Sequence, residues 1–315
     1  MNFELLKNLD VPKGKVDVVL DTDAYNEIDD QYAIAYLLNS EDKLNVKAIY
    51  AAPFFNENSK SPKDGMERSY DEIIKLINLM NRSELTDIIY KGADRYLPDE
   101  KTPVVSEAAQ HLAALAANYT TENPLYIVGI AAITNVASAV LINPEIAKNI
   151  VVVWLGGHSL EFHDTKEFNM MQDIAAARVI MKSDIPLVQL PCMGVVDAFK
   201  ISKPELEFWL KGKNKLCDYL VEHTVRAAEA YASGKPWERV IWDVTAVAWL
   251  LNRDDKFMLS RIVNKHIPNY DFQYNLSKDC GFMRYVYSIN CGNVKICAVE
   301  KSPKSEIYAI SNLFF

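Results

Sequence analysis

The segment VDVVLDTDAYNEIDDQYAIAYLL, residues 16–38, carries the clearest fold signal in the chain. It begins with an apolar, β-branched run over residues 16–20, which is typical of a buried strand. Apolar residues recur at helical intervals over residues 33–38. Between these parts lie five acidic residues, at positions 21, 23, 27, 29 and 30. We therefore expect a strand, an acidic loop and a helix, with the loop at the carboxyl edge of a sheet, where open α/β folds bind ligands.

The carboxylates of the acidic loop are close enough in sequence to repel one another. Two carboxylates about 4 Å apart repel by about 1–4 kcal/mol, depending on the effective dielectric. A hard divalent cation such as Ca²⁺ or Mg²⁺ would relieve that repulsion, as would shared protons. The structural alternative is that Asp29 caps the helix, Asp30 interacts with the helix dipole and the other carboxylates are solvated. Since the loop lacks the EF-hand pattern, a metal here needs ligands from elsewhere in the chain.

Composition narrows the class of protein. Half of the 315 residues are hydrophobic, which is enough for a sizeable core. A net charge of −8 argues against nucleic acid as a partner, because phosphate binding needs a basic surface. The five scattered cysteines favour a reducing compartment, and the N-terminal residues lack the apolar core of a signal peptide. Without a run of about 20 apolar residues, we expect a cytoplasmic protein that does not span a membrane.

Apolar runs and helical patterns alternate along most of the chain. Strand-like runs occupy residues 46–52, 88–91, 125–130, 150–155 and 186–190. This alternation predicts an α/β fold with a doubly wound, mostly parallel open sheet and helices on both faces. Residues 203–252 are mainly helical in pattern and are expected to form a rim, whereas residues 284–289 and 294–299 alternate like a hairpin. No repeat or linker is evident, so we expect a single domain over residues 1–315.

Three later segments supply further candidate site residues. A backbone carbonyl near Ile130, in the turn GIAAITN, could complete a metal shell, or the turn could simply begin a helix. Glu167 and Asn169 could bind sugar hydroxyls, although an ordinary polar loop would also explain them. Asp243 could bind a metal or cap the next helix, and Trp242 could stack on a ring or belong to the core. In the expected topology, all three segments reach the edge that holds the acidic loop.

Together these motifs resemble the inosine-uridine preferring nucleoside hydrolase family. That family carries DxDPGxDD after its first strand, a GPLTN-like turn, an AEFN segment and a late His-Asp pair. This chain has DTDAYNEIDD, IAAITN, KEFN and WD in the same order, at residues 21–30, 130–135, 166–169 and 242–243. The resemblance therefore spans most of the chain.

The resemblance implies an N-ribosyl hydrolase that splits ribonucleosides into free base and ribose and carries a bound Ca²⁺. It implies that Asp23, Asp30, Asp243 and the carbonyl of Ile130 hold the ion. Asp23 would also be the general base that takes a proton from water. The implied partner is a small-molecule nucleoside, and the implied assembly is a homodimer or a homotetramer.

The resemblance also implies the substrate contacts. Asp29 and Asn169 would hold the ribose hydroxyls, and Glu167 would contact the 5′ end. Asn56 would match the ribose-contacting Asn that follows the second strand, with Asn58 as the competing choice. Carboxylates near the sugar would stabilise the positive charge that develops in an oxocarbenium-like transition state.

The chain departs from the family pattern in four places. The acidic loop is two residues longer, the GPLTN-like turn lacks its Gly-Pro, and Glu161 stands where an Asn is usual. Most importantly, Trp242 replaces the His of the late His-Asp pair, which resembles the purine-preferring branch, where a ring stacks on the base. Tyr96 could provide a second ring for such stacking. His158 and His163 are alternative acids for the leaving base.

Two other functions remain open at this point. A protein of the same fold could bind nucleosides or ribose without turnover, because the leaving-group residue is altered. A haloacid dehalogenase-type phosphatase would use Asp21 as its nucleophile, but that fold needs an acidic pair on another strand, whereas here the pair lies close behind Asp23.

Overall fold

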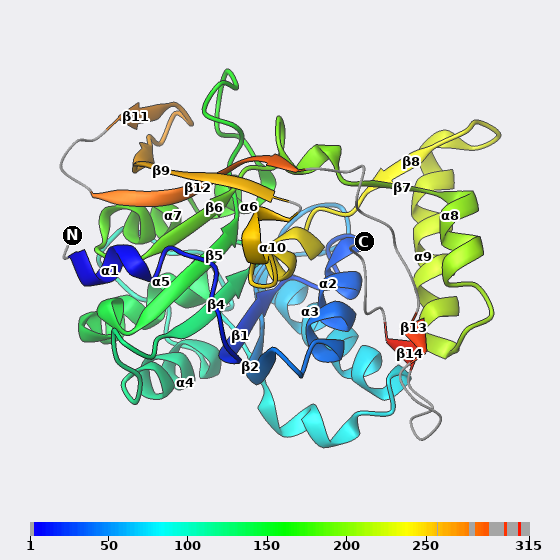
Figure 1. Cartoon of the computed structure of the whole chain (residues 1–315), viewed down its shortest axis with the longest axis horizontal. Coiled ribbons are helices and arrows are strands. Elements are labelled where there is room, and N and C mark those ends of the chain that lie inside the picture. Colours follow the sequence, from blue (N-terminus) through cyan, green and yellow to red (C-terminus); the bar gives the residue numbers. More distant parts are fainter. Residues whose placement is uncertain (1–2, 257, 277–280, 290–298, 301–307, 310–315) are drawn as a thin grey trace.

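A computed structural model describes residues 3–256, 258–276, 281–289, 299–300 and 308–309 (Figure 1). Its centre is an eight-stranded sheet in the order β3-β2-β1-β4-β5-β6-β12-β9. All neighbouring strands are parallel except β12 and β9, which are antiparallel. The strands of this sheet are β1 (Val16–Thr22), β2 (Leu44–Ala51), β3 (Ile89–Lys91), β4 (Leu125–Gly129), β5 (Ile150–Leu155), β6 (Leu187–Leu190), β9 (Met258–Asn264) and β12 (Phe282–Ile289).

The register aligns the carboxyl ends of the central strands. Asp21 near the end of β1 is paired with Tyr50 of β2 on one side and with Gly129 of β4 on the other. The same row continues through Trp154 of β5 to Gln189 of β6. The loops that follow β1, β4, β5 and β6 therefore all leave the sheet at one edge.

Helices cover both faces of the sheet (Figure 1). Val18 and Leu20 of β1 pack with α2 and α3 on one face, whereas Val19 packs with α4, α5 and α7 on the other. The predicted α/β, doubly wound and mostly parallel fold is therefore confirmed. The helices are α1 (Phe3–Lys7), α2 (Asp29–Asn39), α3 (Pro62–Leu79), α4 (Glu107–Ala116), α5 (Thr134–Ile142), α6 (Phe168–Gln172), α7 (Ile174–Lys182), α8 (Lys203–Trp209), α9 (Lys215–Ala232) and α10 (Val244–Trp249).

Local sequence signals explain where several helices begin. Ser61 accepts a hydrogen bond from the N–H of Asp64 at the start of α3. Ser106 and Asn214 make the same kind of cap for α4 and α9. Each cap satisfies a backbone N–H that has no partner within its helix.

The helices of the C-terminal third form the predicted rim. In α9, the carbonyl of Leu220 accepts a hydrogen bond from Tyr32 of α2, and Tyr219 contacts Lys75 of α3. Within the described ranges, no helix is both long and apolar enough to cross a lipid bilayer. Short strands complete the described structure: β7 (Lys200–Ser202), β8 (Glu238–Val240), β10 (His266–Pro268), β11 (Tyr274–Leu276), β13 (Val299–Glu300) and β14 (Tyr308–Ala309).

The strand predicted at residues 284–289 is present, but its predicted hairpin partner is wrong. These residues belong to β12, which lies between β6 and β9 and has both of its edges paired. The reason is burial: Met283, Tyr285 and Val286 of β12 are fully buried, so the strand is part of the main sheet. The other half of the predicted hairpin spans residues 294–299. Residues 294–298 lie outside the described residues, and Val299 belongs to β13, which pairs with β14.

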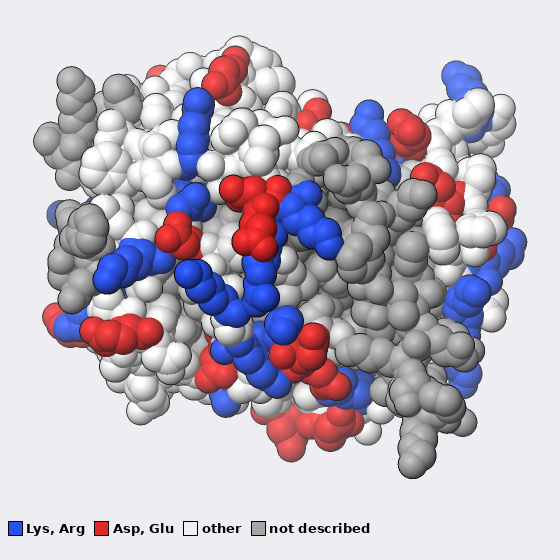
Figure 2. Space-filling model, in the orientation of Figure 1, with Lys and Arg blue, Asp and Glu red and all other residues white. Residues whose placement is uncertain are grey.

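The surface carries charges of both signs. Figure 2 shows Lys and Arg side chains interspersed with Asp and Glu side chains on the face seen in Figure 1. Ion pairs of the molecule include Arg284 with Asp10 and Arg82 with Glu84, in which the acidic side chains are 70% and 61% exposed. Pairs of this kind contribute little to stability, about 0–1 kcal/mol each.

Gly65 of α3 provides a test of the packing around the loop that follows β2. A Cβ atom at Gly65 would overlap the carbonyl oxygen of Phe54, so we expect Gly65→Ala to lower the free energy of unfolding by about 1–3 kcal/mol. At an open helical position the same change would be stabilising. Gly14→Ala is the control, because nothing lies within 4 Å of its Cβ. Urea unfolding of both variants is the measurement, and equal midpoints would contradict the packing.

Candidate active site

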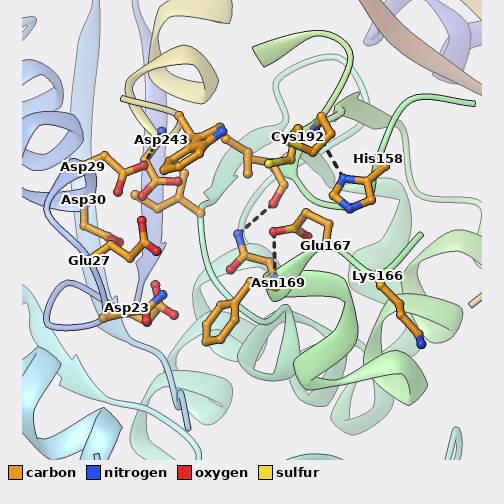
Figure 3. A pocket seen from close by; sticks show the side chains of 16 residues that line it. Asp23, Glu27, Asp29, Asp30, His158, Lys166, Glu167, Asn169, Cys192 and Asp243 are labelled. Carbon is orange, nitrogen blue, oxygen red and sulfur yellow. Dashed lines mark hydrogen bonds between the residues drawn. The ribbon is translucent and has the colours of Figure 1, made fainter. Parts of the chain in front are cut away.

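A pocket of about 230 Å³ opens at the carboxyl edge of the central strands (Figure 3). It lies where the strand order turns from β1-β2-β3 to β4-β5-β6, the place at which doubly wound sheets bind ligands. Its wall comes from the loops after β1, β4, β5 and β6 and from the residues just before α10. The residues that line it are Asp23, Asn26, Glu27, Asp29, Asp30, Ile130, Leu155, His158, Lys166, Glu167, Phe168, Asn169, Cys192, Met193, Trp242 and Asp243.

Three buried carboxylates meet on the acidic side of the pocket. One carboxylate oxygen from each of Asp29, Asp30 and Asp243 lies within 4.8 Å of the other two. Asp29 and Asp30 form the first turn of α2, and Asp243 immediately precedes α10. The backbone N–H of Asp243 donates to Asp29 Oδ2 at 3.2 Å, and Thr22 Oγ1 donates to Asp30 Oδ1. Neither α2 nor α10 has a side-chain cap, so the capping alternative does not describe Asp29 or Asp243.

Asp23 lies beside these three carboxylates (Figure 3). Its side chain is only 1% exposed, and its Oδ2 has no hydrogen-bond partner among the described residues. The carbonyl of Asp23 accepts the N–H of Asn26 at 2.7 Å, which forms a tight turn as the chain leaves β1. Asp23 is not one of the three residues within 4.8 Å of one another, but it faces the same pocket.

Burial raises the pKa values of these carboxylates, so they ionise less readily. Desolvation raises the pKa of Asp29 to about 6 and that of Asp30 to about 7. For Asp23 and Asp243, desolvation and then repulsion from neighbouring carboxylates raise the pKa well above its usual range. At neutral pH the group must therefore hold protons or a cation. An all-oxygen donor set with an unpartnered buried oxygen suits a hard divalent ion.

The turn after β4 brings Ile130 to the pocket. The N–H of Ile130 donates to the carbonyl of Asp21 at 2.9 Å, which holds the end of β4 against β1. Asn135 supports the turn, because its Nδ2 donates to Asp21 Oδ1 at 2.8 Å and its Oδ1 accepts the N–H of Ala93. Asp21 itself is fully buried and lies outside the pocket wall, so it is not placed for the nucleophilic role that a phosphatase would require.

Glu167 and Asn169 form the wall opposite the acidic group (Figure 3). The carboxylate of Glu167 accepts three backbone N–H groups, those of Gly157, Asn169 and Met170, at 2.8–2.9 Å. Burial raises the pKa of Glu167 to about 7, although these hydrogen bonds oppose the shift. The Nδ2 of Asn169 donates to the carbonyl of Leu155 at 3.0 Å. Both side chains are therefore held in fixed orientations at the pocket surface.

Trp242 contributes a half-buried ring to the wall beside Asp243. The guanidinium of Arg239 lies over this ring, 5.2 Å from its centre, and pairs with Glu27 of the acidic loop. The Nε1 of Trp242 has no hydrogen-bond partner within the described chain. The pair of Arg239 and Glu27 thus links the ring to the loop after β1, which fixes the ring next to the pocket.

Several predicted residues lie elsewhere. Asn56 and Asn58 are outside the pocket wall, and Asn56 instead donates to Asn26 Oδ1 at 2.6 Å. Tyr96 is directed to Gln172, with which it forms a hydrogen bond. The side chains of His163 and Glu161 are 78% and 71% exposed.

Of the two candidate histidines, His158 reaches the pocket. Its Nδ1 accepts the N–H of Met193 at 3.3 Å, and burial lowers its pKa, so the neutral ring carries its proton on Nε2. Cys192 lies next to it, and burial raises the pKa of its thiol, which stays protonated.

Some pocket residues were not singled out from the sequence. Asn26, Lys166, Cys192 and Met193 fall in loops without a periodic pattern, and their place depends on how those loops run over the sheet edge. For Asn26 a signal did exist, because the acidic loop is longer than the family motif at that point.

Comparison with solved structures shows the same fold in nucleoside hydrolases. The purine-preferring ribonucleoside hydrolase from Gardnerella vaginalis superposes with a TM-score of 0.70 at 18% identity, covering 88% of this chain and 94% of that chain. A plant nucleoside hydrolase, PpNRh1, gives 0.67 at 19%, covering 88% and 95%. The inosine-uridine preferring enzyme from Bacillus anthracis gives 0.62 at 18%, covering 87% and 95%. No curated protein matches the sequence.

The match to a family model gives the class of the protein, an N-ribosyl hydrolase, which is a glycosidase. The family model for inosine-uridine preferring nucleoside hydrolases matches residues 18–284. The chain belongs to that family, and the predicted resemblance is confirmed. Membership implies a metal-dependent enzyme whose substrate is a small nucleoside, and the buried carboxylates provide the acidic donor group that such an enzyme needs.

The raised pKa values predict how the stability of the metal-free protein depends on pH. Asp29 and Asp30 hold protons up to about pH 6 and 7 in the folded state, but only to about 3.8 when unfolded. Folding therefore takes up protons between about pH 4 and pH 7. The contribution of these two groups to the free energy of unfolding is fully present below pH 4, and it is lost as the pH rises towards 7. We expect the Tm of the chelator-treated protein, measured by scanning calorimetry, to fall between pH 5 and pH 8 through these groups.

Ca²⁺ provides the control for this prediction. Because the ion binds ionised carboxylates, saturating Ca²⁺ should raise the Tm more at pH 8 than at pH 5. An equal rise of the Tm at both pH values would contradict the assignment of these carboxylates as the source of the pH-dependent stability.

Proposed function

We propose that this chain is a Ca²⁺-dependent ribonucleoside hydrolase that prefers purine nucleosides and releases free base and ribose. The observation that carries the proposal is the meeting of Asp29, Asp30 and Asp243, from opposite ends of the chain, at the carboxyl edge of the sheet. Family membership supplies the reaction class. The identity of the ion and the preferred base are our inferences from the donor atoms and from Trp242.

The proposed ion ligands are Asp23, Asp30, Asp243 and the backbone carbonyl of Ile130. All four residues line the pocket, and the three carboxylates are buried with raised pKa values. Oxygen-only ligands favour Ca²⁺ over softer metals. When bound, the ion supplies charge that lowers the pKa of water and orients the sugar hydroxyls. Asp29 lies in the same group and lines the pocket, so we assign it to the sugar hydroxyls beside the ion.

The remaining steps belong to side chains of this chain. Asp23 is the proposed general base, because its carboxylate lines the pocket and, once ion binding has displaced its proton, can accept a proton from the attacking water. Asp29 and the amide of Asn169 hold the ribose hydroxyls, and the carboxylates stabilise positive charge on the sugar in the transition state. Glu167 faces the 5′ end, where a carboxylate that already accepts three N–H groups still has an acceptor site for a hydroxyl.

The proposed base site is the ring of Trp242. Arg239 lies at 5.2 Å from the ring centre and Glu27 anchors Arg239, so the indole is held in place for stacking. A purine covers more of an indole than a pyrimidine does, which supports the purine preference. His158 is neutral with its proton on Nε2, so it can donate a hydrogen bond from the pocket wall.

Three further expectations stay predictions. We propose a cytoplasmic location, in keeping with the free thiols of Cys192 and Cys217. A homodimer or a homotetramer is expected from the family, and a single domain over residues 1–315 is expected because the sequence has no evident repeat or linker. Sedimentation and limited proteolysis address the last two.

Release of free ribose tests the proposed function directly. Protein loaded with Ca²⁺ should release ribose from inosine and guanosine faster than from uridine and cytidine. Asp23→Asn should lower kcat by about 10²–10⁴-fold, because it removes the general base. Absence of ribose release from every nucleoside tested, together with tight nucleoside binding by calorimetry, would favour the binding-protein alternative. Near wild-type kcat in Asp23→Asn would exclude Asp23 as the base.

Trp242 provides a separate test of base preference. Trp242→Ala should lower kcat/KM for inosine by about tenfold, the effect of losing one base–aromatic stack. The loss for uridine should be clearly smaller. Trp242→Phe is the matched control and should keep most of the activity, because it retains a ring. Equal losses for inosine and uridine in the Ala variant would argue against stacking on this side chain.

A further inference from the structure

Asn26 is a pocket residue that the family motif does not supply. It lies in the part of the acidic loop that is two residues longer than the family pattern. Its side chain is only 8% exposed and lines the pocket beside Asp23. A buried amide at the wall of a substrate pocket needs a hydrogen-bond partner for each of its polar atoms, because an unsatisfied one is costly.

Two hydrogen bonds hold the backbone of Asn26, and a third orients its side-chain amide. The N–H of Asn26 donates to the carbonyl of Asp23 at 2.7 Å, and the Nδ2 of Asn58 donates to the carbonyl of Asn26 at 2.8 Å. The Nδ2 of Asn56 donates to Asn26 Oδ1 at 2.6 Å. Because the Oδ1 of Asn26 accepts the hydrogen bond from Asn56, the NH₂ group points away from Asn56. This NH₂ donates no hydrogen bond to any residue in the described part of the chain.

The chemistry of the pocket gives this NH₂ a role. The surrounding carboxylates of Asp23, Asp29 and Asp30 only accept hydrogen bonds when they are ionised. A sugar hydroxyl that donates its proton to a carboxylate still has lone pairs that require a donor. Asn26 supplies a donor on the carboxylate side of the pocket, whereas Asn56, the expected ribose contact, lies outside the pocket wall.

We propose that Asn26 binds a ribose hydroxyl through its Nδ2, and that Asn56 is a positioning residue that acts through Asn26. This inference rests on the proposed nucleoside hydrolase function. The ribose contact that the family pattern assigns to the Asn after the second strand has thus moved to the lengthened loop. Asn56 and Asn58 instead hold that loop against the segment that follows β2.

A double-mutant cycle on inosine hydrolysis by the full, Ca²⁺-loaded chain separates the two roles. Asn26→Ala should lower kcat/KM about tenfold, as expected for one lost hydrogen bond. Asn56→Ala should lower kcat/KM in the wild-type background but change it less than about twofold in the Asn26→Ala background. If Asn56→Ala causes the same fold loss in both backgrounds, Asn56 contacts the substrate itself and the proposal is overturned.

Two further variants test whether the loss of kcat/KM in Asn26→Ala comes from a change of fold rather than from the lost contact. Asn26→Asp keeps the acceptor for Asn56 but replaces the NH₂, so it should lose at least as much kcat/KM as Asn26→Ala. Its activity is measured in saturating Ca²⁺ and below its Tm, because an added carboxylate destabilises the metal-free group of buried carboxylates. Asn45→Ala is the matched control, because Asn45 is an exposed Asn near the opposite end of β2 that bonds to Asp17. It should leave kcat/KM unchanged. Wild-type kcat/KM in both Asn26 variants would overturn the proposal.

Ribose binding distinguishes failure of this inference from failure of the proposed function. If the wild-type chain releases no ribose from any nucleoside, the hydrolase proposal fails, and calorimetry with ribose then decides the role of Asn26. About tenfold weaker ribose binding by Asn26→Ala than by the wild type would support the contact. Equal binding, or no ribose binding by the wild type, would overturn it.

Discussion

Mutual repulsion among buried carboxylates is the constraint on which this structure depends. Asp23, Asp29, Asp30 and Asp243 are all at most 5% exposed, and burial raises the pKa of each. Gathering such groups costs several kcal/mol per charge unless a proton or a cation compensates. The surrounding fold must therefore be stable enough to hold them together. A bound metal ion would stabilise such a site, because it would offset the repulsion that folding creates.

The sheet and two helices supply the necessary rigidity. The first turn of α2 carries Asp29 and Asp30, and α10 packs directly against α2 immediately after Asp243. Trp249 of α10 and Tyr32 of α2 are both buried in the core on that face. Apolar burial on this scale contributes about 1.5–3 kcal/mol for each large side chain. The packing of α2 against α10 thus offsets the electrostatic cost of the site at the place where it arises.

Much of the fold and part of the site could be predicted from the sequence. The first strand and the acidic residues are contiguous, so a local pattern identified them, as it did the alternation of strands and helices. Asp243 lies 214 positions from Asp29, and only the order of motifs pointed to their contact. The pairing of β12 with β9 and the departure of Asn56 from the pocket depend on long-range packing and loop paths, which leave no local periodicity. The greater length of the acidic loop marked the region of Asn26 as unusual, but the motif gave no role to the added residues.

The most direct test of the account is the position of the ion. Anomalous X-ray diffraction from crystals grown with saturating Ca²⁺ would locate it without reference to activity. The account predicts one fully occupied peak in the pocket, about 2.3–2.6 Å from carboxylate oxygens of Asp23, Asp30 and Asp243. A pocket without such a peak, in crystals that bind Ca²⁺ elsewhere, would contradict it.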